Sequence, residues 1–291
     1  MRLAGSVESL TTRRRLIGHR GGVSQTASIE TVLKSTRSRT MLNKVPEVTI
    51  YFWIIKILCT TVGESLADYI NETLGFGLVN TTWLFGGLFV LALGWQFSLR
   101  RYVPFAYWLT VVLVSVFGTL LTDNMTDGHN VPLNRSTILF GVLLVITFAA
   151  WYWRERTLSI HSINTTHREA WYWLTVLVTF ALGTAVGDYT LELTGWTPGV
   201  SVLLPAGLIA AVFIAWRFGA GPVLTFWIAY ILTRPLGANI GDYLSSNHSD
   251  GGLALGTLGT SLLFLGAILG TVIYLSLSKV DRTPENLAQT A

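Results

Sequence analysis

One pattern occurs four times in this chain of 291 residues, and it restricts the fold more than any other feature. It consists of a tryptophan, a glycine ten positions later and an aspartate five positions after the glycine. Because a pattern that recurs at such intervals marks an internal repeat, the chain is expected to contain four similar units. The residues of the pattern are Trp53, Gly63 and Asp68; Trp108, Gly118 and Asp123; Trp173, Gly183 and Asp188; and Trp227, Gly237 and Asp242.

Each repeat contains two apolar stretches, and the composition indicates that these stretches cross a membrane. Charged residues make up 12% of the chain, whereas a soluble domain has about 25%. A helix that spans a bilayer needs about 20 apolar residues. The sequence therefore predicts an all-α membrane protein with eight transmembrane helices, built from four parallel two-helix repeats. The expected helices cover residues 47–73, 78–97, 105–125, 136–153, 171–193, 200–216, 223–244 and 253–277.

The residues before the first helix differ from the rest of the chain. Residues 1–44 are rich in Ser, Thr, Gly and Arg and have no long apolar run, so we interpret them as a disordered cytoplasmic tail. A natural start at Met41 is the first alternative, and a transit peptide is the second. The expected boundaries of the other segments are 45–100 (repeat 1), 101–156 (repeat 2), 157–170 (cytoplasmic linker), 171–218 (repeat 3), 219–279 (repeat 4) and 280–291 (cytoplasmic tail).

The distribution of charge predicts the orientation in the membrane. Basic residues such as Arg100, Arg101 and Arg154 lie in the loops between repeats, whereas Asp127 and Asp250 lie in loops inside them. The positive-inside rule then places both termini in the cytoplasm. The net charge of +4 is modest and fits a membrane surface better than a nucleic-acid surface. We therefore expect a lipid bilayer as partner and no nucleic acid.

The glycines and tryptophans of the pattern have expected structural roles. A glycine and a small residue four positions apart lie on one helix face and let membrane helices approach closely. The tryptophans fall near the cytoplasmic helix ends and are interpreted as interfacial anchors, with packing against the neighbouring repeat as the alternative. Lys56 lies near the same end, where its side chain is expected to reach the interface. The glycines expected to pack helices are Gly63, Gly118, Gly183, Gly187, Gly237 and Gly241.

The four aspartates carry the chemical information. An ionisable group at membrane depth normally faces a bundle interior or a water-filled cavity. Repeat symmetry would turn all four toward a common axis, where like charges need compensation by a cation or by shared protons. Carboxylates suit hard cations such as magnesium or manganese. The alternative is that each aspartate hydrogen-bonds a neighbouring backbone group and is structural. The candidate metal ligands are Asp68, Asp123, Asp188 and Asp242.

Three departures from the repeat symmetry favour a functional interpretation. Glu64 adds a second carboxylate four residues before Asp68, and Asn239 lies three residues before Asp242. Arg234 lies inside an apolar run, where an arginine is costly and should have a carboxylate partner. We include Glu64, Asn239 and Arg234 in the expected cation pathway, with Arg234 as a counter-charge.

The repeats resemble a known family. The stretches KVPEVTIYFWIIKILCTTVGESLADY, RYVPFAYWLTVVLVSVFGTLLTDN, REAWYWLTVLVTFALGTAVGDY and FWIAYILTRPLGANIGDYL are similar to those of a bacterial family of membrane-anchored proteins, which has four tandem repeats with two transmembrane stretches each. The resemblance covers residues 44–279. It implies a bacterial inner-membrane protein with eight helices, and it implies no particular activity.

We therefore expect a transporter of a small cation, either a divalent metal or a proton. The alternative is a membrane scaffold or sensor, in which the aspartates and glycines only pack the repeats together. The chain has no Walker P-loop, no H-E-x-x-H motif and no visible nucleophile–base pair. We expect neither an enzyme nor a cofactor, and nothing in the sequence indicates an oligomeric state.

Overall fold

The structure is a computed structural model that describes residues 42–283 and residue 286. The described residues belong to one compact unit that begins at Leu42. The expected tail of residues 1–44 therefore needs a correction at its end, because Leu42, Asn43 and Lys44 are all buried. The rest of that tail, including the alternative start at Met41, lies outside the described residues.

The described part of the chain contains eight helical segments that are long and apolar enough to span a membrane. This confirms the predicted fold class and places each helix close to its expected range. The helices are α2 (Ile50–Asp68) continued by η1 (Tyr69–Thr73), α3 (Leu78–Ser98), α4 (Pro104–Thr126), α5 (Leu133–Glu155), α6 (Thr166–Thr194), α7 (Pro198–Ser201) followed by α8 (Leu203–Arg217), α9 (Pro222–Ser245) and α10 (Gly256–Ser278).

Local sequence signals explain where these helices begin and end. Helices α4, α7 and α9 each begin at a proline, which suits the first helical position because its missing N–H has no partner there anyway. Helix α6 begins five residues before the expected position, since the Thr165 hydroxyl accepts a hydrogen bond from the Arg168 backbone N–H at 3.3 Å. It ends at Thr194 and is followed by Gly195 in the left-handed conformation, a usual helix stop.

The first helices of the four repeats form a closed inner ring. Helix α2 contacts α4 and α9, and α6 contacts the same two helices. The tryptophan–glycine–aspartate pattern lies on these four helices, so all of its residues come from the ring. Between 56% and 72% of the spanning part of each ring helix is buried.

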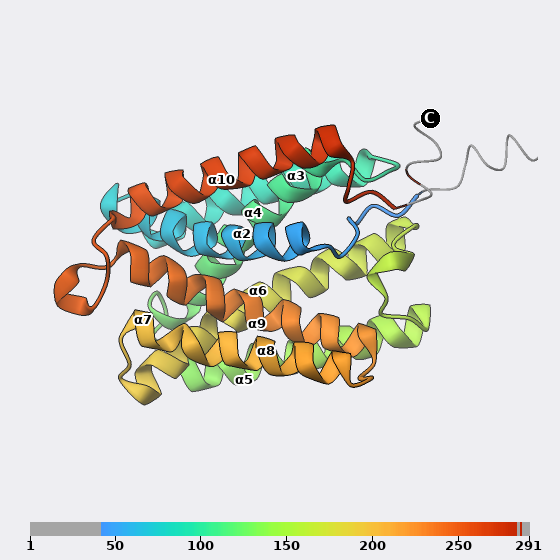
Figure 1. The fold of residues 1–291 in the computed structure, drawn as a ribbon. Coiled ribbons are helices and arrows are strands. Elements are labelled where there is room, and N and C mark those ends of the chain that lie inside the picture. Colours follow the sequence, from blue (N-terminus) through green and yellow to red (C-terminus); the bar gives the residue numbers. More distant parts are fainter. Residues whose placement is uncertain (1–41, 284–285, 287–291) are drawn as a thin grey trace, which may run out of the picture. The chain divides into compact units, whose positions relative to one another are not determined.

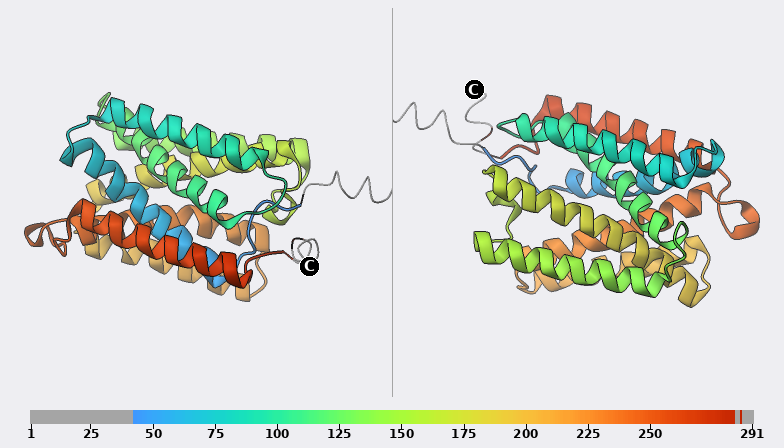
Figure 2. Two further views of the ribbon diagram at one scale, coloured as in Figure 1. Left: turned by 90° about the horizontal axis from the view of Figure 1, so that it is seen from above. Right: turned by 180° about the vertical axis from the view of Figure 1, so that it is seen from behind.

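The second helix of each repeat packs against the first helix of the next repeat. Helix α3 packs on α4, α5 on α6 and α8 on α9, while α10 returns to pack on α2. Figure 1 shows α10 lying along α2 and α8 lying along α9, and Figure 2 gives the same arrangement from two other sides. Only 11–28% of the spanning part of these outer helices is buried. Their exposed apolar side chains form the surface that faces lipid.

We call the end of the ring where α2, α4, α6 and α9 begin the basic end, and the opposite end, which carries the four aspartates, the acidic end. The segment before α2 crosses the basic end, where the Glu47 N–H donates to the Asp281 carbonyl at 2.9 Å. Lys44 forms a buried ion pair with Glu169, with Nζ and Oε2 2.6 Å apart. Both ends of the described chain therefore meet at the basic end.

Candidate functional site

The glycines of the pattern lock each ring helix to the next. In each case the contact is with the residue three positions before the glycine of the following repeat. A Cβ on Gly118 would lie 2.6 Å from the Cβ of Phe180, and the other three glycines face equally close neighbours. The pairs are Gly63 with Ser115, Gly118 with Phe180, Gly183 with Arg234 and Gly237 with Thr60.

The two further small-residue glycines pack less tightly. A Cβ on Gly187 would lie 3.7 Å from Pro235, and a Cβ on Gly241 would lie 3.4 Å from the Thr61 carbonyl oxygen. Both are ordinary contacts. Among the six glycines assigned to packing, those at the pattern positions therefore have the more demanding role.

Arg234 lies at the centre of the ring and is 1% exposed. Its Nη2 donates to Glu64 Oε2 at 2.7 Å, so Glu64 is the carboxylate partner that its position requires. The same nitrogen donates to the Thr184 hydroxyl at 2.8 Å and to the Thr119 hydroxyl. Glu64, Thr119 and Thr184 all follow the pattern glycine directly, so three repeats use the same position to hold the arginine of the fourth.

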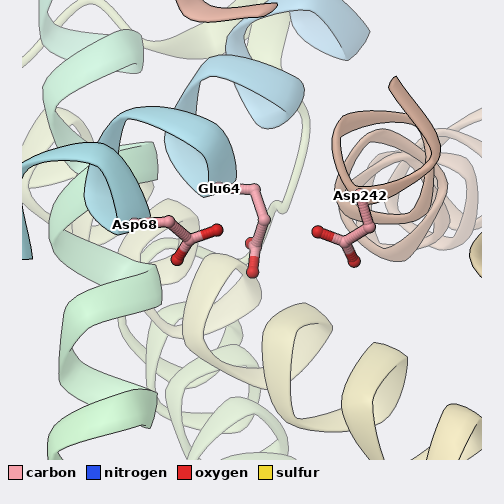
Figure 3. Close-up of side chains that lie close together, drawn as sticks. All are labelled: Glu64, Asp68 and Asp242. Atoms are coloured by element: carbon pink, nitrogen blue, oxygen red, sulfur yellow. The ribbon is translucent and has the colours of Figure 1, made fainter. Parts of the chain in front are cut away.

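Three carboxylates gather beside this arginine. One oxygen atom from each of Glu64, Asp68 and Asp242 lies within 4.8 Å of the others, and Figure 3 shows the three side chains pointing toward one another. Glu64 and Asp68 come from α2 and Asp242 comes from α9. Glu64 is 8% exposed, and the two aspartates are half-buried. Such a group of oxygens has the composition of a site for a hard cation.

The helix geometry near Asp68 is unusual. Helix α2 ends at Asp68 and continues as one π turn, in which the Leu74 N–H donates to the Tyr69 carbonyl at 2.9 Å. Single π turns are rare and occur frequently at functional sites. Among the described ring helices this turn occurs only in repeat 1, which also carries the additional carboxylate Glu64.

The other two aspartates are not part of the three-carboxylate group. Asp123 on α4 and Asp188 on α6 are half-buried and close enough to Glu64 for their charges to interact. In the described part of the chain, no hydrogen bond or ion pair is formed by any of the four aspartate carboxylates, whereas a capping role would need one. The structure thus brings two of the four predicted aspartates together with Glu64 and places two nearby.

Asn239 forms its hydrogen bond outside the group of three carboxylates. It is 2% exposed, and its Nδ2 donates to the Ser201 carbonyl at 3.0 Å. Ser201 is the last residue of the short helix α7. Asn239 therefore joins α9 to α7, and its place in the cation pathway stays a prediction.

The tryptophans differ from their expected role as interfacial anchors. Trp108, Trp173 and Trp227 are 1%, 2% and 4% exposed, and Trp53 is half-buried. They pack in one aromatic cluster inside the ring, where the rings of Trp227 and Tyr230 are 5.5 Å apart. The alternative interpretation, packing against neighbouring repeats, describes them better, because closing the ring brings these positions together.

Lys56 also differs from expectation, because its side chain stays inside the ring. It is 1% exposed, and its Nζ lies 4.0 Å from the ring centre of Phe180 and 4.2 Å from that of Tyr230. Two aromatic faces stabilise the ammonium there in place of water. Lys56 is therefore a second basic group inside the ring, in addition to Arg234.

Sequence reasoning missed a pair of buried tyrosines. The hydroxyls of Tyr107 and Tyr172 are 2.5 Å apart, and both residues are buried. Each directly precedes a pattern tryptophan, and the equivalent positions in the other repeats are Phe52 and Phe226. The sequence does carry a signal for these tyrosines, because an aromatic residue precedes every pattern tryptophan.

Fold and site together define a multi-pass helical membrane protein made of tandem two-helix repeats around a polar centre. The chain belongs to the family described as Repeat of Unknown Function (DUF347), whose pattern matches residues 51–102, 106–157 and 225–281. These matches cover more than half of the chain, confirm the resemblance and correspond to repeats 1, 2 and 4. Repeat 3 lies outside them, although its helix α6 occupies the same place in the ring.

Part of the chain is also similar to one component of a larger complex. It is 22% identical over 126 residues to a subunit of the ion-translocating oxidoreductase complex of Salmonella arizonae. The subunits named alike from Escherichia coli strain SE11 and Shigella sonnei are 23% identical over the same length. Each match covers 43% of this chain and only 30% of the relative. No solved structure matches.

Proposed function

We propose that this protein carries a small cation across the membrane through the centre of the ring. The observation that supports this most directly is the group of Glu64, Asp68 and Asp242, which lie on candidate membrane-spanning helices with one oxygen atom of each within 4.8 Å of the others. The names of the relatives from the oxidoreductase complex mention ion translocation, which agrees with this proposal.

Charge compensation indicates which cations suit the site. The Arg234 guanidinium pairs with Glu64 and compensates one of the three carboxylates. Two negative charges then remain among three groups that lie close together, and such an arrangement needs a divalent cation or two protons to be stable. A divalent metal and a proton are therefore the two candidate substrates.

The orientation belongs to the same proposal. Arg100, Arg101, Arg154, Arg156 and Arg168 all lie at the basic end of the ring, in or beside its loops. With these residues in the cytoplasm of a bacterial cell, the positive-inside rule is satisfied. Both termini are then cytoplasmic, and the three-carboxylate group lies toward the outer side of the inner membrane.

The experiment uses the full chain purified into lipid vesicles. We expect uptake of Mn²⁺ or movement of protons by the wild-type protein, and at least a tenfold lower flux in a variant with both Asp68→Asn and Asp242→Asn. The amide keeps the shape of the carboxylate and removes its charge. Asp127→Asn is the matched control, because Asp127 is exposed in the loop after α4 and should leave the flux unchanged.

The alternative function is a membrane scaffold or sensor, and the close glycine contacts between neighbouring repeats favour it. A scaffold needs the shape of the aspartates and not their charge. If the double variant folds and its flux equals that of the wild type, the cation site is wrong and the scaffold replaces it.

A further inference from the structure

Lys56 lies on the polar axis of the ring without a charged partner. Its Nζ is fully buried and forms no hydrogen bond among the described residues. The titratable and charged groups that face it are Cys59 on its own helix and Arg234 and Tyr230 on α9. Phe180 covers it from α6. No carboxylate is among these groups, so the ammonium has aromatic faces in place of a counter-charge.

Hydroxyl groups continue from Lys56 toward the basic end. Tyr230 touches Lys56 through its ring, and its buried hydroxyl lies near that of Tyr172 but forms no hydrogen bond among the described residues. Tyr172 in turn shares a 2.5 Å hydrogen bond with Tyr107. The ring of Tyr107 lies 5.7 Å from that of Tyr102, whose hydroxyl donates to Asp281 Oδ2 at 2.5 Å. These tyrosines come from three ring helices and the loop before α4.

Outside the spanning segments, this series of tyrosines ends at the carboxyl group of Asp281, which is buried. Burial raises the pKa of Asp281 above its usual value, and the hydrogen bond from Tyr102 opposes that shift. Burial likewise raises the pKa of Tyr102, so the phenol keeps its proton while it donates to the carboxylate. Asp281 follows α10 at the basic end, where the series would meet the cytoplasm.

The same half of the ring is unsuited to a metal ion. Between Arg234 and the aromatic cluster of the pattern tryptophans, the described ring helices carry no Asp or Glu. Glu169 at the basic end is already paired with Lys44. A divalent cation moving inward would meet the charge of Lys56 without an anionic ligand to compensate for lost water. A proton needs no such ligand, because a lysine amine can carry it as its own charge.

We propose that Lys56 and the hydroxyls of Tyr230, Tyr172 and Tyr107 form the inner half of the transport path, and that this half carries protons only. This inference rests on the proposed function and specifies its substrate. The acidic end then serves as the outer part of a proton path.

The transfer steps balance without a further reactant. A tyrosine hydroxyl releases its proton to one neighbour as it receives another proton from the opposite side, so every phenol ends the step neutral. Lys56 changes between ammonium and amine as it releases and accepts one proton. Its flexible stem of four carbons allows Nζ to move between the two rings and the Tyr230 hydroxyl.

The test measures proton flux with a pH-sensitive dye inside vesicles that contain the full chain, driven by a potassium diffusion potential. We expect Tyr172→Phe to lower the flux at least tenfold, because the ring keeps its volume while the hydroxyl link is lost. Lys56→Met should give the same loss. Tyr274→Phe is the matched control, since its half-exposed hydroxyl bonds only to Tyr51 in the described part of the chain.

Parallel measurement of Mn²⁺ uptake separates this inference from the proposed function. Uptake of Mn²⁺ without proton movement in the wild-type protein would overturn the proton path and leave a cation carrier. Wild-type proton flux in Tyr172→Phe would overturn it as well, even if Lys56→Met does not fold. Absence of both fluxes in the wild-type protein would overturn the proposed function together with this inference.

Discussion

The stem of Arg234 occupies space that residue 183 leaves free by being glycine. A Cβ at position 183 would lie 2.5 Å from the Cβ of Arg234 and 3.3 Å from the Cδ of Pro235. The guanidinium at the far end of that stem is held by Glu64, Thr184 and Thr119. The stem cannot retreat without pulling these bonds apart, so Gly183 determines where the central charge lies.

Gly183→Ala is therefore expected to destabilise the protein by about 1–3 kcal/mol, the usual cost of overpacking a tight contact. It should also lower cation flux, because the displaced guanidinium no longer faces Glu64. Gly187→Ala is the control on the same helix, with a nearest contact of 3.7 Å and a gain in helix propensity. Thermal unfolding in detergent checks both variants, and equal melting temperatures would contradict the expectation.

Removal of Arg234 alone should be more damaging than removal of the whole ion pair. Arg234→Met leaves Glu64 buried and unpaired, which costs about 3–5 kcal/mol in comparable buried pairs. Combining it with Glu64→Gln removes the stranded charge and should restore much of the lost stability. A double-mutant cycle measured by detergent unfolding gives the coupling. Arg168→Met, at a more exposed pair with Glu155, is the comparison and should cost less. Additive effects of Arg234→Met and Glu64→Gln would show that the pair is not coupled.

Shortening the chain from its beginning should have little effect up to Met41 and a large effect soon after it. Residues 1–40 have no apolar run that would pack. Loss of Lys44 removes the partner of the buried Glu169 and the contact of its Nζ with the Phe97 carbonyl, at 3.1 Å. We expect a chain that begins at Met41 to melt like the full chain, and one that begins at Val45 to melt earlier. Lys44→Met in the full chain should reproduce the second result.

Reporter fusions test the orientation of the ring. Fusions after Arg101, Arg156 and Lys279 should report the cytoplasm, because all three positions lie at the basic end. Fusions near Asp127 and Asp250 should report the opposite side. If most of these sites gave the reverse, the three-carboxylate group would face the cytoplasm and the proposed direction of the path would change.

The helices and their class could be predicted from the sequence because apolar length determines them directly. The need of Arg234 for a carboxylate partner could be predicted too, but the identity of that partner, Glu64, could not. The neighbours of each helix could not be predicted, since lipid-facing and ring-facing stretches have similar hydropathy. The burial of the pattern tryptophans could not be predicted either, because it depends on aromatic residues that the neighbouring ring helices bring together.

Lys56 shows a second limit of sequence reasoning. Its distance from the helix end suggested a side chain that reaches water, and only the positions of Phe180 and Tyr230 on two other helices reveal an aromatic site. Both residues lie more than 100 positions away in sequence. A contact of this kind depends on how the repeats close around the axis, which no local pattern reports.

Because α10 packs on α2 as α3 packs on α4, no repeat is first or last in space. The Glu47 N–H and the Asp281 carbonyl are hydrogen-bonded at 2.9 Å, so the two ends of the folded unit are already neighbours. Joining them with a short linker and opening the chain in the loop between α5 and α6 would leave every helix–helix contact in place. The order in which the ribosome makes the four units is thus separate from the architecture that they form.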